Sequence, residues 1–454
     1  VDRRAKNLGL DPLPDIDFNI RCGNTLVGYA TEKEIEESLY GSLESNQNFS
    51  KYIQPEMEKV SMAYDAFRTI QLSQHEDMAT FKEAKEELRS RLKKFTDSLN
   101  YQMFSHSGCA DYDAWLTSHQ PFHWIAEYYQ IIHGNGGFDV IIGNPPYLEQ
   151  RQISYKVEGY KTKDSSAVHA YCIERSVNLL NSHGAISMIV PLAIVCTQRM
   201  VAVQKILENR TVWYSNYAWR PDKLFDAVNR SLSIFIANHT DRETSAFSTP
   251  YIKWTSDNRE TLLQLVSYVS YNEKRDSFWM PKLTVEIEKN ILRKLLVCKA
   301  SLNNYTTKSQ YRMYYRTTGG LYWKVFTNFP PAFFCNGQQG NSSRETHLCF
   351  KDAKQTCAFV AIFSSNLFWW WYTLTANLRD LNPSDLQGLK LSDSLLVDED
   401  LYKSSLKYLK SLQDNSVMLT REQKGKGTTQ TQSFKINLSK PIIDEIDKVL
   451  AKHY

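Results

Sequence analysis

The sequence has few features that would place it outside a reducing cytosolic compartment. Its eight cysteines include no Cys-x-x-Cys pair, and its ten histidines do not cluster with them at metal-ligand spacing. We therefore expect free thiols, no disulfide framework and no metal site. No signal peptide is recognisable, and no apolar run approaches the roughly 20 residues of a membrane span. The densest apolar stretch, 367–372, is too short. The predicted location is the cytoplasm, with no membrane partner.

Strong charge is also missing. The formal net charge is +4 over 454 residues, with 42% hydrophobic and 23% charged residues. This composition is typical of a globular protein of about two to four domains, and it permits a nucleic-acid partner without requiring one. A phosphate-binding loop is absent as well. The glycines of 134–137 precede a predicted strand, whereas a phosphate-binding turn follows one.

The most informative segment is 138–147, Phe-Asp-Val-Ile-Ile-Gly-Asn-Pro-Pro-Tyr. Its first five residues form an apolar, partly β-branched run, which predicts a buried strand. Gly143 ends the strand, and 144–147 then form a rigid polar corner with an aromatic ring at its end. The four residues 144–147 alone would fit a plain turn after a strand. Together with the segment that precedes them, they favour a catalytic role.

Such a corner can activate a conjugated amine. The Asn144 side chain and the Pro145 carbonyl can accept hydrogen bonds from an NH2 group, and consecutive prolines fix the direction of both acceptors. The bonds favour a more tetrahedral nitrogen whose lone pair can attack a methyl sulfonium, while Tyr147 would stack on the base. This chemistry works by positioning and needs no metal. A base within a duplex would have to flip out to reach the corner.

The rest of the first half predicts an α/β arrangement. Alternation at Phe18, Ile20 and Cys22 predicts a strand, and Gly23-Asn24 a turn at its carboxyl end, where ligands bind in open α/β sheets. Asn24 is thus a candidate cofactor contact, although a plain turn fits the sequence too.

Residues 31–130 are charged, with apolar residues at helical spacing, and predict an inserted helical hairpin or small bundle. From 138 to 238, strands at 185–190, 212–219 and 231–238 alternate with helices at 168–180 and 197–209, typical of a mostly parallel sheet.

Basic residues outside the corner suggest contacts with phosphates. Arg151 and Lys156 lie in a polar loop, 148–166, that suits either a phosphate contact or an ordinary exposed loop. Residues 301–343 contain Arg312 and Arg316 among many aromatics and no Asp or Glu, which suits nucleic-acid binding or a hydrophobic core about equally. Arg379 opens a polar segment, 379–384, that could read DNA. Residues 421–434 look like a linker, and 441–454 predict an amphipathic helix.

Several segments together resemble one family. They are 122–124, 136–147, 171–176, 317–324, 366–372, 379–383 and 440–447. The chain resembles adenine-specific (N6) DNA methyltransferases of the type II-G restriction-modification and phage-exclusion kind. The resemblance implies a partial Rossmann-like methyltransferase sheet at 1–30 and 131–245, a helical insertion at 31–130, and a mixed α+β target-recognition domain with a C-terminal helix at 246–454. It also implies S-adenosylmethionine, double-stranded DNA, and restriction or defence-system subunits as partners.

The resemblance assigns residues as well. Asn144, Pro145, Pro146 and Tyr147 would be catalytic. The cofactor would contact Asn24 and Thr25, together with Phe138 and Asn144. DNA contacts are expected at Arg151, Lys156, Arg312, Arg316 and Arg379.

One departure from the family is large. No glycine-rich turn for the cofactor's methionine part lies upstream of Asp15, and the chain begins at Val1. We therefore expect a truncated fragment that binds S-adenosylmethionine weakly alone. Two rivals remain: a DNA-reading specificity module without catalysis of its own, and a methyltransferase acting on protein glutamine or RNA.

Overall fold

The structure, a computed structural model, describes residues 17–39, 53–72, 78–272, 278–319, 323–423 and 427–454. Its contacts divide the chain into two compact units. Unit 1 comprises Val1–Val190, Arg199–Val212 and Ile234–Thr244, and unit 2 comprises Pro191–Gln198, Trp213–Ser233 and Ser245–Tyr454. The domain boundaries expected from the sequence stay a prediction.

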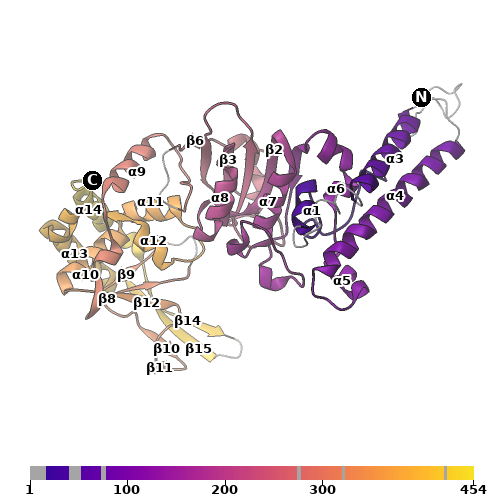
Figure 1. The fold of residues 1–454 in the computed structure, drawn as a ribbon. Coiled ribbons are helices and arrows are strands. Elements are labelled where there is room, and N and C mark those ends of the chain that lie inside the picture. Colours follow the sequence, from indigo (N-terminus) through magenta and orange to yellow (C-terminus); the bar gives the residue numbers. More distant parts are fainter. Residues whose placement is uncertain (1–16, 40–52, 73–77, 273–277, 320–322, 424–426) are drawn as a thin grey trace, which may run out of the picture. The chain divides into compact units, whose positions relative to one another are not determined.

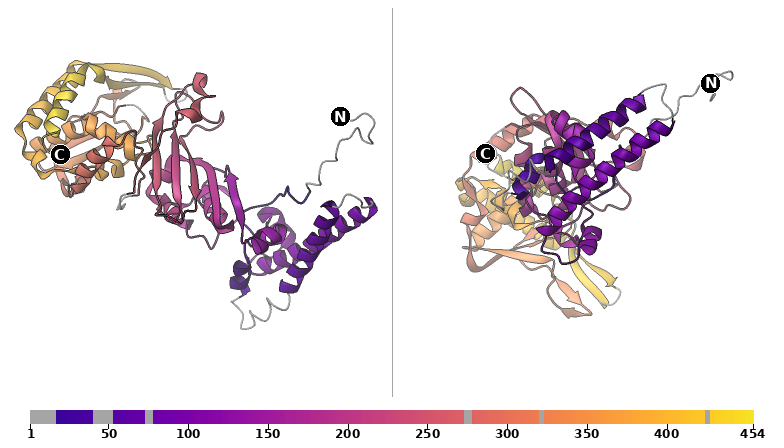
Figure 2. Two further views of the ribbon diagram at one scale, coloured as in Figure 1. Left: turned by 90° about the horizontal axis from the view of Figure 1, so that it is seen from above. Right: turned by 45° about the vertical axis from the view of Figure 1, so that its right-hand side comes forward.

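Helices dominate the first part of unit 1, as the sequence predicts. They are α1 (Glu32–Leu39), α3 (Gln54–Leu72), α4 (Met78–Ser105), α5 (Tyr112–His119) and α6 (Trp124–Glu127). Helices α3 and α4 lie side by side (Figures 1 and 2). Their shared core takes Met57, Val60 and Phe67 from α3 and Leu88, Leu92, Phe95 and Leu99 from α4. The apolar spacing of 81–99 therefore predicted the buried face of α4.

The strand expected at 18–22 does not form. Residues 17–19 make a turn, and Asn24 has only an isolated bridge to Pro121. Phe18 is buried in the helical core, where its ring meets Phe67 edge-on at 5.0 Å, while Ile20 is 70% exposed. Of the three alternating residues only Phe18 is buried, because Ile20 and Cys22 are both exposed, so the alternation did not indicate a strand.

A six-stranded sheet follows, with strand order β1-β2-β4-β3-β5-β6. Its strands are β1 (Phe138–Gly143), β2 (Leu180–Pro191), β3 (Thr211–Tyr217), β4 (Leu232–Asn238), β5 (Ala246–Ile252) and β6 (Val269–Ser270). β1 and β2 are parallel, with Gly143 opposite Met188, whereas β5 and β6 are antiparallel. Helix α7 (Val168–Leu179) was predicted closely, and α8 (Val201–Leu207) is shorter than predicted. The α/β fold class is confirmed, with a mixed sheet.

The expectation that residues 138–142 form a buried strand is wrong. β1 occupies an edge of the sheet, and Val140 and Ile142 are 58% and 79% exposed. These two side chains point to one face because side chains alternate along a strand. Phe138, nearer the start of β1, is partly covered by the rings of Trp124 and Tyr128. The apolar run correctly indicated a strand, but not its place in the sheet.

Unit 2 adds smaller sheets and a helical layer. Its helices are α9 (Ile287–Val297), α10 (Ala353–Ser364), α11 (Asn366–Thr375), α12 (Pro383–Gly388), α13 (Glu399–Asp414) and α14 (Lys440–Leu450). Its further strands are β7 (Ala300–Ser301), β8 (Thr306–Arg316), β9 (Phe326–Thr327), β10 (Phe333–Cys335), β11 (Gln338–Gln339), β12 (Glu345–Phe350), β13 (Lys390–Leu391), β14 (Ser416–Gln423) and β15 (Gly427–Phe434). The C-terminal helix is confirmed as α14. The linker expected at 421–434 is wrong, because these residues belong largely to the paired strands β14 and β15.

The structure bears on three expectations drawn from composition. All eight cysteines are free thiols, as predicted. Among the described helices, none is long and apolar enough to cross a membrane. Within the same described residues, no group of three or more His, Cys, Asp or Glu side chains is placed to hold a metal ion.

Candidate active site

The polar corner stands at the carboxyl end of β1. Pro145 is buried and anchors the turn, whereas Asn144 and Pro146 are exposed. The Tyr147 hydroxyl lies 2.9 Å from Asn144 Oδ1 and 3.0 Å from the backbone oxygen of Ile189 in β2, and it can donate to either. The corner is therefore tied to the neighbouring parallel strand, and the Asn144 amide is held beside it facing solvent.

The chain after the corner is clamped to the start of α7. The amide of Val168 donates to the Leu148 carbonyl, and the amide of Gln150 donates to the Ser166 carbonyl, both at 2.9 Å. Glu149 adds a two-pronged ion pair to Arg199, at 2.7 and 2.9 Å. Hydrogen bonding and charge from Arg199, opposed by partial burial, lower the pKa of Glu149. These contacts fix the direction in which the chain leaves the corner.

The two basic residues of this loop differ in their surroundings. Arg151 lies exposed in the short 3-10 turn Gln150–Gln152. Lys156 is also exposed, but its ammonium pairs with Glu158. The ion pair opposes a phosphate contact by Lys156, so Arg151 is the better placed of the two.

Asn24, Thr25 and Phe138 come together through Trp124. The Trp124 indole donates to the Thr25 carbonyl at 3.4 Å, and its ring meets the Phe138 ring edge-on at 5.8 Å. Tyr128 contacts the same Phe138 ring at 5.4 Å. Asn24 Oδ1 accepts the amide of Leu26 at 3.2 Å, which leaves that oxygen one further lone pair. Trp124 was not assigned a role from the sequence.

Two glycines allow the segment around Asn24 to approach Phe122. Gly28 has φ of +127°, and a Cβ there would lie 2.2 Å from the Phe122 carbonyl oxygen. A Cβ on Gly23 would lie 2.8 Å from the Phe122 side chain. Only glycine fits the first position, because its backbone conformation and its space both exclude a side chain.

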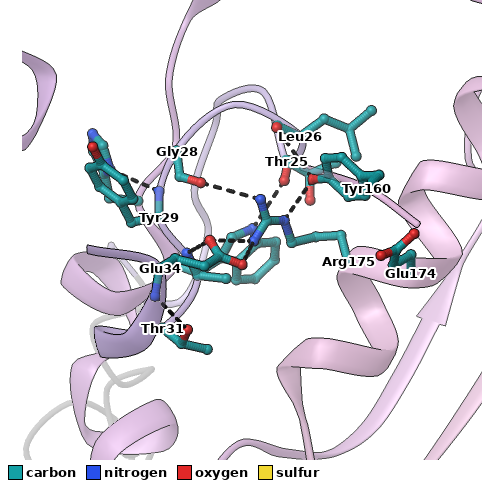
Figure 3. A network of polar contacts seen from close by, with 12 residues as sticks. Thr25, Leu26, Gly28, Tyr29, Thr31, Glu34, Tyr160, Glu174 and Arg175 are labelled. Carbon is teal, nitrogen blue, oxygen red and sulfur yellow. Dashed lines mark hydrogen bonds and ion pairs between the residues drawn. The ribbon is translucent and has the colours of Figure 1, made fainter. Parts of the chain in front are cut away.

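Arg175, a buried residue of α7, forms hydrogen bonds to the 24–28 segment and its neighbours, as Figure 3 shows. Arg175 Nη1 donates to both oxygens of Glu34 at 2.6 and 2.8 Å, and Nη2 donates to the Gly28 carbonyl at 3.3 Å. Its Nε donates to the Tyr160 hydroxyl at 2.9 Å, and that hydroxyl in turn lies 3.3 Å from the Leu26 carbonyl. One side chain thus joins α1, the 24–28 segment and the loop that follows the corner.

His123 completes the polar core beside this network. Its Nδ1 accepts the amide of Tyr29 at 3.1 Å, so its Nε2 carries the hydrogen and donates to Asn100 Oδ1 at 3.0 Å. Burial, reinforced by the Arg175 charge, lowers the pKa of His123 to about 3. The ring is neutral at physiological pH and serves as a structural hydrogen-bonding group.

A cavity of about 590 Å³ adjoins the Arg175 network. Gly28, Glu34, Tyr160 and Arg175 line it, together with Lys156 at its rim. Neither Asn144 nor Tyr147 belongs to its lining. The cavity is therefore separate from the polar corner.

Two of the candidate DNA contacts of unit 2, Arg312 and Arg316, lie on one face of β8. Arg312, Tyr314 and Arg316 alternate with the buried Met313 and Tyr315, so the three point outward together. The cross-strand neighbour of Arg316 is Glu345 of β12, whose pKa is raised by burial despite the arginine.

Arg379 lies elsewhere in unit 2, with its side chain 71% exposed and 3.9 Å from Asp380. The residues around it differ in exposure. Leu378 and Leu381 are buried, and Asn382 and Asp385 form the capping box of α12. Arg379, Asn382, Pro383 and Ser384 are exposed, so most of 379–384 can reach a ligand, whereas Leu381 is packed.

Sequence comparison identifies one family over part of the chain. Residues 34–217 match the Eco57I restriction-modification methylase family. No curated protein matches the chain.

Three solved structures show remote likeness. LlaGI, a Type ISP restriction-modification enzyme solved as a nuclease-deletion mutant with a DNA substrate mimic, is 11% identical with a TM-score of 0.30, over 53% of this chain and 26% of its own. DNA-bound LlaBIII, an ATP-dependent Type ISP enzyme, is 9% identical with a TM-score of 0.32, over 90% of this chain and 42% of its own.

The third is a putative class I S-adenosylmethionine-dependent methyltransferase from Listeria monocytogenes, 12% identical with a TM-score of 0.21, over 51% of this chain and 97% of its own. The chain thus spans about a quarter of LlaGI and about two fifths of LlaBIII. Over residues 34–217, a segment that includes the polar corner, the chain is similar to restriction-modification methylases of the Eco57I family.

Proposed function

We propose that this chain is the methyl-transferring and DNA-reading part of a restriction-modification or phage-defence methyltransferase, acting on N6 of adenine in DNA. The observation that carries the proposal is the corner at 144–147. An exposed asparagine amide stands at the end of a strand, on a proline-fixed turn, with Tyr147 bonded beside it. The family match over residues 34–217 supports a methylase.

In this proposal the corner acts on the target amine. Asn144 Oδ1 and the Pro145 carbonyl accept its two hydrogens, which localises the lone pair on nitrogen for attack. The Tyr147 hydroxyl donates to Asn144 Oδ1 or to the Ile189 carbonyl. This hydrogen bond fixes the position of the ring, and hence the face of an incoming base on which it can stack. The adenine would reach the corner by leaving the duplex.

S-adenosylmethionine would supply the methyl group, and the segment at 24–25 fits its adenine end. Asn24 Oδ1 keeps a lone pair for an amine, the Trp124 indole donates to the Thr25 carbonyl, and the Phe138 ring packs on Trp124. The described residues offer no matching glycine-rich turn for the methionine end.

The test is transfer of labelled methyl from S-adenosylmethionine to unmethylated duplex DNA, followed by nucleoside analysis. Label in N6-methyladenine supports the proposal. Duplex DNA binding without transfer, at saturating cofactor, would favour a specificity module. Label in RNA or protein glutamine, with none in DNA, would move the activity to a different substrate class.

A further inference from the structure

The three-stranded sheet β12-β8-β9 of unit 2 has one packed face. Helix α10 lies against the sheet (Figure 1). The ring of Phe326 in β9 lies 5.5 Å from that of Phe363 in α10, measured between centroids. The ring of Phe350 in β12 stacks on that of Phe359 at 4.4 Å. Side chains that alternate with the buried set along β8 therefore point away from α10.

The opposite face presents two rings and two arginines. Tyr314 of β8 and His347 of β12 are cross-strand neighbours, and their ring centroids are 5.6 Å apart. Arg312 and Arg316 lie two residues to either side of Tyr314, which is about 7 Å along a strand. Both arginines and His347 are exposed, and Tyr314 is half-buried. These four residues form one surface, the β8–β12 platform.

The charge of the two strands favours a polyanion as the partner. Residues 306–316 and 344–350 contain four cations, all of them exposed: Lys308, Arg312, Arg316 and Arg344. The same residues contain one acid, Glu345, which is half-buried opposite Arg316. Four positive charges against one negative charge leave a formal charge of +3. Exposed cations in such excess attract the phosphates of a nucleic acid.

The two rings indicate which form of nucleic acid fits the platform. A tyrosine or histidine ring can stack on the face of a base. In a duplex those faces are covered by the neighbouring base pairs, so a duplex offers the platform only its phosphates. An unpaired nucleotide offers both a phosphate and an open base face. Rings and arginines on one face of a sheet therefore fit unpaired nucleotides better than a paired duplex.

We propose that the β8–β12 platform binds unpaired nucleotides of DNA, with Tyr314 and His347 stacking on bases while the two arginines contact the phosphates beside them. The inference rests on the proposed function for its substrate, DNA, and names the surface that holds unpaired nucleotides. Such nucleotides occur in a single strand and where a base has left a duplex. The alternative is that Tyr314 and His347 only stabilise the sheet as a cross-strand pair.

The first test compares two double variants of the full chain. Tyr314→Ala with His347→Ala removes the rings of the platform. Tyr129→Ala with His133→Ala is the matched control, because it removes a half-buried tyrosine and an exposed histidine whose rings lie 4.9 Å apart in unit 1. Fluorescence anisotropy measures the affinity for a single-stranded oligonucleotide and for the same sequence as a paired duplex.

The platform variant should bind the single strand roughly fivefold to a hundredfold more weakly, which is the loss expected for one stacked base. Its affinity for the paired duplex should stay within about twofold of wild type, because both arginines remain. The control should keep both affinities. A duplex with one extra, unpaired base identifies the source of the nucleotide. A loss with this ligand as well assigns the platform to bases displaced from a duplex, and a loss with the single strand alone assigns it to free strands.

Two results would overturn the inference in favour of a structural pair. They are an unchanged affinity of the platform variant for the single strand, and an equal loss with single strand and duplex. Label transfer to duplex DNA tests the proposed function separately. Transfer by a wild-type chain that binds no unpaired DNA would overturn the inference alone, whereas no transfer and no binding of any form of DNA would overturn both.

The second test needs no substitution. Cys349 of β12 lies opposite Arg312 and carries a half-buried free thiol. Bound single strand should slow alkylation of Cys349 severalfold, measured by mass spectrometry, and leave the exposed Cys109 of unit 1 unchanged. Equal alkylation of Cys349 with and without saturating single strand, under conditions where binding is verified, would contradict the placement of DNA on this face.

Discussion

The polar corner at Asn144 and the outward face of β8 would meet the same substrate with opposite kinds of residue. The corner uses neutral groups on a proline-fixed turn, held by the hydroxyl of Tyr147. The β8 face presents Arg312 and Arg316 on a strand whose other side is packed. Neutral acceptors act through geometry at contact distance, whereas exposed cations act through a field that salt screens. Chemistry and affinity should therefore be separable by mutation.

The largest expected effect is the loss of methyl transfer when Asn144 is replaced, with duplex binding retained. Asn144→Ala removes one of the two acceptors for the target amine, so methyl transfer should fall about 10²–10³-fold or more, by analogy with removal of a single oxyanion-stabilising group. Duplex binding should stay within about twofold of wild type. Labelled methyl transfer and fluorescence anisotropy measure the two quantities.

Asn135→Ala is the matched control, because Asn135 is an exposed asparagine in a turn of the same unit. It should leave both quantities unchanged. Parallel losses of transfer and binding in Asn144→Ala would contradict the division between the corner and β8.

Removing Arg175 should show how far the segment at 24–28 depends on its buried support. Arg175→Ala removes the ion-pair partner of Glu34, which keeps only the Ala30 amide, and the donor to the Gly28 carbonyl. Breaking a fully buried pair costs about 3–5 kcal/mol, and because the Glu34 side chain is 28% exposed we expect a loss of about 2–3 kcal/mol. Arg199→Ala, which breaks the more exposed pair with Glu149, should cost about 1 kcal/mol or less. Urea unfolding of the two variants measures the difference, and equal losses would show that burial of the Arg175 network does not govern its contribution.

The β8 arginines should affect binding alone. If Arg312 and Arg316 contact phosphates, each alanine substitution should weaken duplex binding severalfold and reduce the slope of log affinity against log salt by roughly 0.9. Binding is measured between about 50 and 200 mM salt. Arg293→Ala on α9 is the control, because it removes the same charge away from β8. An equal change in the salt-dependence slope in all three variants would indicate a general effect of charge rather than a phosphate contact by β8.

The sequence predicted what depends on local pattern and missed what depends on distant contacts. The strand at 138–142, the corner after it and the buried face of α4 follow from short-range periodicity. The strand expected at 18–22 failed because Phe18 packs against Phe67, nearly fifty residues away in the chain. The Arg175–Glu34 pair joins residues 141 positions apart. An arginine within the otherwise mostly apolar helix α7 was the one available signal.

The strands β14 and β15 were missed for a related reason. Strand prediction relies on one apolar face, and the alternating threonine and glutamine residues of 429–432 offer none. The exposure of β1 was equally hidden, since Val140 and Ile142 have the residue types of a central strand. Both the missed strands β14 and β15 and the unexpected exposure of β1 concern strands with exposed side chains. The alternation of apolar and polar residues along one strand does not show which other element packs on it.

The smallest expected effect is a pH dependence at the edge of the corner. Because pairing with Arg199 lowers the pKa of Glu149 in the folded protein, its carboxylate stabilises the fold above the ordinary value of 4.5. That contribution is lost as the pH falls through the lower folded-state pKa. Solvent screening limits it to roughly 0.5–1 kcal/mol, because both side chains are about one third exposed. The unfolding midpoint of Glu149→Gln should therefore lie below wild type near neutral pH and converge with it in acid. A pH-independent gap would mean that the contribution of Glu149 does not come from its charge.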